Sequence, residues 1–281
     1  GRLIWTIHNV LPHELRHREE EIALRRFLAA RATHVHVLSP ATVEAVQHLY
    51  PLDPDRVRLI PISSYLGWYP DTVTRDEARR ALGIDPADTV LTTVGGIRPY
   101  KGHARLLDWF SSVADEDPHL RLLVAGRVED PESAEALLER LEHARITARL
   151  EFVPDDEIQL WYRSADLAVL PYSSILNSSA VWLAITFGVP VVAPRLGALV
   201  ELEELAFVRL FDPSDPEDLG RVVAAARREL VDPDRPERWR EQVRAHAAGR
   251  SPQHMAEQFS ALVLEAAATG PGRGRRLRAR A

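Results

Sequence analysis

The stretch from Leu167 to Pro194, LAVLPYSSILNSSAVWLAITFGVPVVAP, places the strongest constraint on the fold of this chain. Its first apolar run ends at Leu170, a polar turn follows, an apolar segment of helical length runs from about Ser178 to Phe187, and a second apolar run begins at Val189. This pattern predicts a strand, a loop, a helix and a second strand. Two buried strands joined through a helix lie parallel, and helices cover both faces of a parallel sheet.

The loop of this stretch carries small polar side chains at the carboxyl end of the expected strand: Ser173, Ser174, Asn177, Ser178 and Ser179. Unpaired N–H groups and the positive end of the dipole attract anions to a helix N-terminus, so this position favours an anion site. The same residue types also cap helices, and capping alone is the alternative interpretation. Gly188 is expected to end the helix.

Strands and helices alternate along the rest of the chain. We expect strands at residues 3–8, 33–38, 57–60, 89–94, 120–125 and 150–153. We expect helices at residues 14–31, 41–49, 75–82, 103–115, 132–143, 155–164, 214–230, 237–248 and 253–268, the sixth of them capped by Asp155 or Asp156. Alternation at this spacing is typical of parallel sheets. The predicted fold class is α/β, with two Rossmann-like doubly wound domains of which the first is incomplete.

A chain of 281 residues is long enough for two domains that each have a hydrophobic core. We expect a partial first domain at residues 1–72, a second domain at 73–250, a C-terminal helix at 251–268 that packs on the first domain, and a basic flexible tail at 269–281. Residues 3–8 already resemble a buried core strand, with no element before them. We therefore expect this chain to be the later part of a longer protein.

Charge and composition narrow the function classes. A net charge of −6 and a pI of about 6.0 predict no general attraction to nucleic acid. The basic end from Gly270 to Ala281 is expected to be a solvated tail, with peripheral contact to a membrane as the alternative. The absence of cysteine excludes disulfides and thiolate sites, and it fits a cytoplasmic location. No apolar run approaches the ~20 residues that span a bilayer.

A glycine-rich segment with two cations, VGGIRPYKG at residues 94–102, joins an expected strand to an expected helix. Gly95 and Gly96 let the backbone approach a ligand closely, and Arg98 and Lys101 supply positive charge. The segment predicts phosphate binding at the carboxyl edge of the sheet. It is neither a Walker loop nor G-x-G-x-x-G, so it does not support the phosphoryl or hydride transfer of those folds.

Several motifs together carry a resemblance to a known family: GGIRPYKG, LRLLVAGR, VPDDEIQLWYRSADLAVLPY, and SSILNSSAVWLAITFGVPVVAP with PRLGALVEL after it. In order and spacing they resemble the glycosyltransferases of group 1, the family 4-like type, which have the GT-B fold of two Rossmann-like domains. The resemblance covers Thr89 to about Leu230. The early segments WTIHNVLPHE and VLSPATVEAV are similar to the later part of that family's acceptor domain.

The resemblance implies a nucleotide-sugar donor bound to the second domain and roles for individual residues there. Lys101 would hold the donor diphosphate, Val153 would meet the base through its backbone, and Ser178 and Ser179 would offer N–H groups to phosphate. Glu201 matches a family glutamate and is our candidate for the ribose hydroxyls. Further donor-site candidates are Gly95, Gly96, Arg127 and Asn177, and Arg98 joins Lys101 as a candidate for stabilising the leaving diphosphate.

The chain also departs from the family pattern. Many members carry two glutamates eight residues apart, one for the donor sugar and one for the ribose. Alignment on Gly188-Val189-Pro190 puts Ile175 and Leu183 at those positions. The usual arginine of the phosphate loop falls on Gly96, with Arg98 two places later as a substitute. The retaining stereochemistry usual for the family is therefore not secured, and we expect a different donor sugar.

Two further patterns have alternative interpretations. His13-Glu14-Leu15-Arg16-His17 fits H-E-x-x-H, a zinc motif, but Pro12 and the charged neighbours are untypical of the apolar helix that a zinc peptidase uses, and His13 and Glu14 better fit an acceptor cleft. His8 is our candidate general base, or else a hydrogen-bonded histidine at a strand end. The Asp-Pro-Asp triplets at 53–55 and 232–234 are expected to be turns in which aspartate caps the backbone.

These observations predict the transfer of a sugar from a UDP- or GDP-linked donor to a hydroxyl of a glycan, a lipid-linked sugar or a small molecule, without a metal or other cofactor. A non-catalytic GT-B module that binds a nucleotide or a partner chain is the first alternative, because both glutamates are missing. A zinc hydrolase is the second alternative. Since the first domain is expected to be incomplete, we expect this chain to bind a nucleoside diphosphate and to transfer little sugar.

Overall fold

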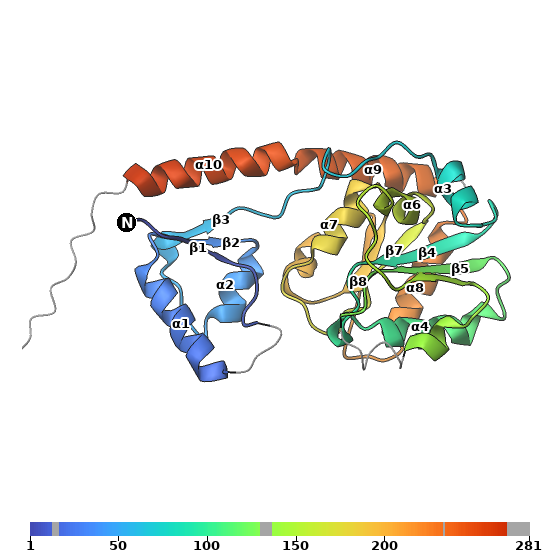
Figure 1. The fold of residues 1–281 in the computed structure, drawn as a ribbon, viewed down its shortest axis with the longest axis horizontal. Helices are drawn as coiled ribbons and strands as arrows, with labels where there is room; N and C mark the ends of the chain where they lie inside the picture. Colours follow the sequence, from blue (N-terminus) through green and yellow to red (C-terminus); the bar gives the residue numbers. More distant parts are fainter. Residues whose placement is uncertain (13–16, 130–136, 233, 269–281) are drawn as a thin grey trace, which may run out of the picture. The chain divides into compact units, whose positions relative to one another are not determined.

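The computed structural model describes residues 1–12, 17–129, 137–232 and 234–268, and these residues pack as two compact units (Figure 1). The first unit consists of Gly1–Pro61 and the described residues from Gln253 on, and the second is Ile62–Pro252. Packing therefore groups residues 62–72 with the second unit, whereas the sequence places a domain boundary after residue 72. The domain boundaries stay a prediction.

The first unit is a small parallel α/β layer. Its strands are β1 (Ile4–Ile7), β2 (His34–Val37) and β3 (Val57–Leu59), paired in the order β1-β2-β3. Helices α1 (Arg18–Arg31) and α2 (Pro40–Val46) connect them, and α10 (Pro252–Ala268) supplies side chains to the same unit. Phe259 of α10 packs edge-on against His36, and Glu265 forms an ion pair with Arg58.

The second unit contains a six-stranded parallel sheet in the order β6-β5-β4-β7-β8-β9. The strands are β4 (Thr89–Val94), β5 (Leu120–Ala125), β6 (Ile146–Arg149), β7 (Leu167–Val169), β8 (Val191–Pro194) and β9 (Val208–Phe211). The helices are α3 (Arg75–Ala81), α4 (His103–Ala114), α6 (Ile158–Arg163), α7 (Ser179–Thr186), α8 (Asp218–Glu229) and α9 (Arg235–Gly249). From the neighbouring strands β4 and β7, the later strands are added in opposite directions across the sheet. Ligands bind at such a switch point in open α/β sheets.

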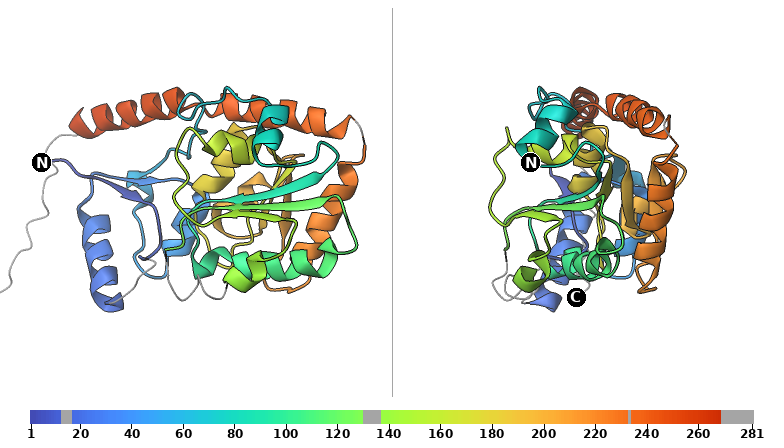
Figure 2. Two further views of the ribbon diagram at one scale, coloured as in Figure 1. Left: turned by 45° about the vertical axis from the view of Figure 1, so that its right-hand side comes forward. Right: turned by 90° about the vertical axis from the view of Figure 1, so that its right-hand side faces the viewer.

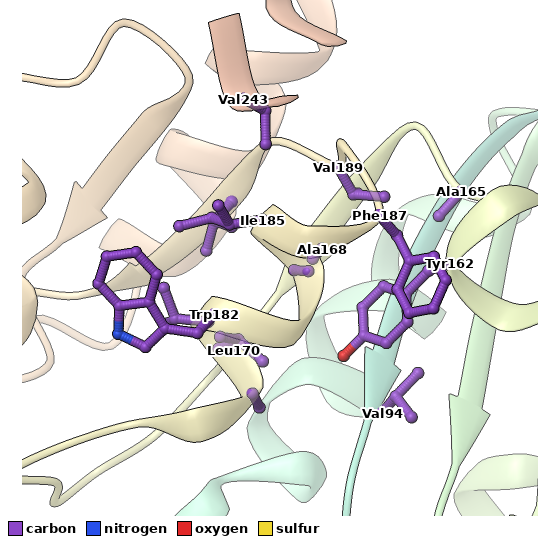
Figure 3. Close-up of a cluster of buried hydrophobic side chains, with 14 of the residues drawn as sticks. Val94, Tyr162, Ala165, Ala168, Leu170, Trp182, Ile185, Phe187, Val189 and Val243 are labelled. Carbon is purple, nitrogen blue, oxygen red and sulfur yellow. The ribbon is translucent and has the colours of Figure 1, made fainter. Parts of the chain in front are cut away.

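Helices cover both faces of the six-stranded sheet (Figure 2). Successive residues of a strand point to opposite faces, so each strand contributes side chains to two separate cores. Val90 and Leu123 join a core with residues of α6, α7 and α9, whereas Leu91 and Leu122 join a second core with residues of α4 and α8. Figure 3 shows part of the first core, in which the rings of Tyr162 and Phe187 stack with centroids 5.4 Å apart. The predicted α/β class with parallel sheets is confirmed, and the six-stranded sheet is doubly wound.

The crossover from Leu167 to Pro194 folds as predicted. Ser178 is the N-cap of α7, and its hydroxyl accepts a hydrogen bond of 3.3 Å from the Val181 N–H. Gly188 follows the helix at φ 76°, a left-handed conformation that glycine adopts without strain. Helix α7 therefore begins at the carboxyl end of β7 and ends near the amino end of β8.

Several predicted elements are wrong in position. Strand β6 occupies 146–149 rather than 150–153, because pairing with β5 fixes its register even though its own residues are only partly buried. Strand β9 is absent from the prediction, since an arginine interrupts its short apolar run. Helix α8 starts at Asp218 rather than at residue 214, because the segment before it forms turns in which Asp212 and Asp215 accept backbone N–H groups.

Helix α6 begins at Ile158, three residues after the predicted start, and its N-cap is Glu157. The prediction that Asp155 or Asp156 caps this helix is wrong, because both lie in the turn before it and no side chain caps it. The predicted helix at 132–143 lies partly, and the tail at 269–281 wholly, outside the described residues. Within the described part of the chain, no helix combines the length and the apolar character needed to span a membrane.

Candidate functional site

The loops after β4 and β5 touch through their glycines. Gly95 donates its N–H to the Ala125 carbonyl over 2.8 Å, which extends the strand pairing by one residue. A Cβ on Gly126 would lie 2.1 Å from the carbonyl oxygen of Gly95, and Gly126 itself has φ 150°. Only glycine fits this contact. The two loops are thereby held with their backbones against each other at the carboxyl edge of the sheet.

The loop after β4 also touches the loop after β7. Ser173 donates both its N–H, over 2.8 Å, and its hydroxyl, over 3.1 Å, to the Tyr100 carbonyl. Gly102 lies at φ 68°, and a Cβ on it would lie 2.0 Å from the carbonyl oxygen of Pro171. Because β4 pairs with both β5 and β7, the segment Gly95–Gly102 lies between the two other loops.

Lys101 ends the short turn Pro99–Lys101, and its Nζ lies 6.0 Å from the centre of the Tyr172 ring. A Cβ built on Gly95 would lie 3.3 Å from the same Nζ, so the ammonium lies over the glycine loop. Burial lowers the pKa of Lys101, the charge of Glu129 raises it and the charge of Arg98 lowers it further. An anionic ligand beside the Lys101 Nζ would stabilise the charged ammonium and so offset the cost of its burial.

Arg98 forms an ion pair across the loops. Its Nε donates to Glu129 over 2.6 Å, and both side chains are about one third exposed. The carboxylate of Glu129 also covers Gly96, since a Cβ there would meet its Oε1. No sequence motif includes Glu129, because only the pairing of β4 with β5 brings it to the segment Gly95–Gly102, the predicted phosphate loop.

The start of α7 lies beside this arrangement. The Ser178 hydroxyl donates to the Tyr172 hydroxyl over 3.4 Å, and burial raises the pKa of Tyr172 to about 12. Ser179 is exposed and is the first residue of the helix. Burial raises the pKa of Tyr65 and a hydrogen bond with the Ser179 side chain lowers it, which places that tyrosine against the helix start. Asn177 is the residue before the cap and is half-buried.

His103, to which no sequence motif points, is the first residue of α4 and is 5% exposed. Its Nδ1 is buried and has no hydrogen-bond partner among the described residues. Burial, with a smaller contribution from the charge of Lys101, lowers the pKa of His103 to about 4. The ring therefore stays neutral at neutral pH beneath a loop that already carries two cations.

The expected base-binding position lies next to an unassigned aromatic side chain. The side chain of Val153 is buried in the core, so only its backbone is free to meet a ligand. Phe152 before it is 65% exposed. Arg127 is exposed, and its carbonyl accepts the Ile97 N–H over 2.8 Å. A phenylalanine that is this exposed offers a stacking surface for a planar base.

Two other candidates belong to other segments of the chain. Glu201 is exposed on a 3₁₀ helix, Gly197–Leu202, and its charge acts on Arg250, whose guanidinium lies 4.9 Å from the centre of the Trp182 ring. His8 belongs to the first unit, where it is exposed at the end of β1. Burial lowers the pKa of His36, a hydrogen bond to the Ile60 carbonyl raises it, and the charge of His8 lowers it.

The zinc motif at 13–17 lies outside the described residues except for His17, which is exposed. Within the described ranges, no group of three or more histidine, cysteine, aspartate or glutamate side chains is arranged to hold a metal ion. In the triplet at 53–55, Asp53 accepts the Asp55 N–H over 3.1 Å, so the predicted aspartate cap is confirmed there.

Residues 74–246 match the sequence profile of the family described as glycosyl transferases group 1, and the chain belongs to this family. A D-inositol 3-phosphate glycosyltransferase of Segniliparus rotundus is 30% identical over 223 residues, which cover 75% of this chain and 45% of the relative. A GDP-mannose:glycolipid 4-beta-D-mannosyltransferase of Xanthomonas campestris is 30% identical over 196 residues, 68% of this chain and 50% of that protein. The chain spans about half the length of these curated relatives.

Solved structures share the fold. Anabaena HepE, solved in complex with UDP and glucose, matches with a TM-score of 0.78 at 17% identity, over 94% of this chain and 72% of its own. WaaG, a glycosyltransferase involved in lipopolysaccharide biosynthesis, matches with a TM-score of 0.72 at 21% identity, over 96% of this chain and 76% of its own. The resemblance to GT-B glycosyltransferases of group 1 is thereby confirmed.

Proposed function

We propose that this chain binds a nucleoside diphosphate sugar on its second unit and serves the transfer of that sugar to a hydroxyl of a glycan, a lipid-linked sugar or a small molecule. The observation that carries the proposal is the position of Lys101, over a glycine loop that is held between the loops after β5 and β7. Anabaena HepE with bound UDP and the GDP-mannose-dependent relative support this class of donor.

Chemically, the bond between the anomeric carbon and the diphosphate oxygen breaks, and its electron pair stays on that oxygen. The oxygen of the acceptor hydroxyl forms the new bond to the anomeric carbon, and its proton passes to a base, for which His8 is our candidate. The charge that grows on the leaving diphosphate is stabilised by Lys101, by Arg98 once it exchanges Glu129 for phosphate, and by the N–H groups at the start of α7.

A binding module without catalysis is the second candidate. Ile175 and Leu183 stand where the family glutamates are expected, and both are partly buried against the main core. No carboxylate at these two positions can therefore contact a donor sugar. Titration with UDP and GDP, followed by a product assay with UDP- and GDP-sugars, tests the proposal. Turnover of any donor would exclude the second candidate. Absence of nucleotide binding would contradict the proposal and leave only a module that binds a partner chain.

Lys101→Ala is expected to weaken the binding of a nucleoside diphosphate by roughly 1.5–3 kcal/mol, about 10- to 150-fold, and to leave nucleoside binding almost unchanged. The reason is that an ammonium on a phosphate is a charge-assisted contact, whereas a nucleoside has no phosphate. Calorimetric titration of UDP and uridine, or of GDP and guanosine, measures both. Arg228→Ala, an exposed arginine on α8, is the matched control. Equal losses for nucleotide and nucleoside would contradict the assignment.

Ser179→Pro is expected to weaken diphosphate binding at least tenfold without lowering the melting temperature by more than a few degrees. Proline removes the N–H of this residue, but it is tolerated at the first position of a helix. Ser178 before it is already extended, at φ −130° and ψ 111°, as a residue before proline must be. Ser179→Ala keeps the N–H and is expected to change affinity less than threefold. If alanine is as damaging as proline, the hydroxyl makes the contact and the backbone account is wrong.

A further inference from the structure

A cavity of about 480 Å³ opens on the second unit, away from the phosphate loop. It is lined by the segment 71–75, by Tyr162, Arg163 and Ala165 at the end of α6, by Phe187–Val189 after α7 and by three residues of α9. Helix α7 runs from the phosphate loop to this cavity, so the two places lie about 12 Å apart along its eight residues. The phosphate loop lies at the carboxyl ends of the strands, and the cavity lies near the amino ends of β7 and β8.

Four arginines line the cavity, and they differ in how well they are paired. The Arg163 Nε donates to Asp71 over 2.6 Å, and Arg75 pairs with Asp166. Arg240 has only long contacts, 3.7 Å to Asp166 and 3.6 Å to Glu237. The fourth, Arg244, lies against Gly188, and its guanidinium has no hydrogen bond or ion pair with any residue described in the structure.

The cavity wall carries an excess of positive charge. Arg79 lies buried behind the wall and donates a hydrogen bond of 2.8 Å to Asp166, so this one carboxylate serves Arg75, Arg79 and Arg240 together. Burial lowers the pKa of Arg240 and the charge of Arg75 lowers it further, whereas Asp166 and Glu237 raise it by smaller amounts. Among the described residues, the four lining arginines and Arg79 have three carboxylates as ion-pair partners, those of Asp71, Asp166 and Glu237. An anion in the cavity would relieve this repulsion.

The rest of the lining is apolar at depth and polar at the edge. Figure 3 shows Tyr162, Ala165, Phe187 and Val189 gathered on one side of the core, and all four line the cavity. Thr72 and Thr74 are exposed at its edge. A small apolar surface next to arginines suits an organic molecule with an anionic group better than a bare ion, and the volume fits a molecule of sugar-phosphate size.

We propose that this arginine-lined cavity is a second binding site, separate from the donor site, for a small organic phosphate. The guanidinium of Arg244 and the weakly paired one of Arg240 would hold the phosphate, because planar guanidinium groups bind phosphate through two parallel N–H donors. The carbon skeleton of the ligand would lie towards the apolar side of the cavity. The proposal does not depend on glycosyl transfer, since it uses no residue of the phosphate loop.

Titration calorimetry of the full chain with glucose 6-phosphate, inorganic phosphate and glucose tests the proposal, with UDP present at saturation. We expect glucose 6-phosphate to bind at one site more tightly than inorganic phosphate, and glucose not to bind. Arg244→Ala is expected to weaken that binding at least tenfold, and Arg244→Lys, which keeps the charge, to weaken it less. Because the Arg244 guanidinium has no partner among the described residues, neither change is expected to lower the melting temperature.

Two matched variants separate this site from the donor site. Lys101→Ala is expected to leave the binding of glucose 6-phosphate unchanged, and Arg228→Ala, on α8 outside the cavity, is expected to have no effect on either ligand. If Arg244→Ala binds glucose 6-phosphate as the unaltered chain does, the proposal is overturned. Loss of this binding on Lys101→Ala would overturn it as well, because the phosphate would then occupy the donor site. Equal binding of glucose would overturn it too, since it would show a sugar pocket without phosphate recognition.

Discussion

Gly102→Ala is expected to lower the free energy of unfolding by roughly 2–6 kcal/mol and to abolish nucleoside diphosphate binding in whatever fraction still folds. Two costs combine: the residue lies at φ 68°, where a side chain is strained by about 1–3 kcal/mol, and its Cβ would lie 2.0 Å from the Pro171 carbonyl oxygen. Relief of that overlap must move the loop after β7 away from the phosphate loop. Chemical denaturation monitored by circular dichroism measures the loss of stability.

Gly83→Ala is the matched control for Gly102→Ala. Gly83 follows α3 at φ 66°, nearly the same conformation, but a methyl group on it would have no described atom within 4 Å. It therefore reports the cost of the backbone conformation alone, about 1–3 kcal/mol. If the two variants lose the same stability, the contact with Pro171 contributes nothing and the account of how the loops are held together fails. Nucleotide binding by Gly83→Ala is expected to be unchanged.

Acidification from about pH 6.5 to pH 4 is expected to remove about 3 kcal/mol of stability through His103 alone. The pKa of His103 in the folded chain, about 4, lies below its ordinary value of 6.5, so the unfolded chain binds the proton more readily. The stabilisation is therefore fully present above pH 6.5 and is lost as the pH falls towards 4. The side chain is 5% exposed, so solvent screens little of this effect.

His103→Gln removes the titrating group and is expected to reduce the difference in unfolding free energy between pH 7.5 and pH 4.5 by roughly 2–3 kcal/mol. Denaturant titrations at the two pH values give that difference for each chain. His119→Gln is the control, because that histidine ring is largely exposed beside Asp88. An unchanged difference for His103→Gln would mean that the buried ring does not govern the acid sensitivity.

The crossover from Leu167 to Pro194 was predictable because its strand, cap, helix and terminating glycine are all local signals. The spacing of apolar residues, the serine at the N-cap and the glycine after the helix can each be recognised from a few neighbouring residues. The edge strands β6 and β9 were not predictable in the same way. Each is only partly buried and contains arginine, and each is a strand because a neighbouring strand offers it hydrogen bonds.

By itself the sequence determined the α/β class and the family motifs, and it predicted a phosphate loop with Gly95, Gly96, Arg98 and Lys101. Only the tertiary structure decided what those residues touch. In the sheet β4 lies between β5 and β7. Glu129 after β5 and Pro171 after β7 therefore both contact the loop that follows β4, although they are far apart in the sequence. The same holds for the arginines of the cavity, which α3, α6 and α9 bring together. Contacts of this kind depend on how strands and helices pack in space, and no local pattern of residues encodes that packing.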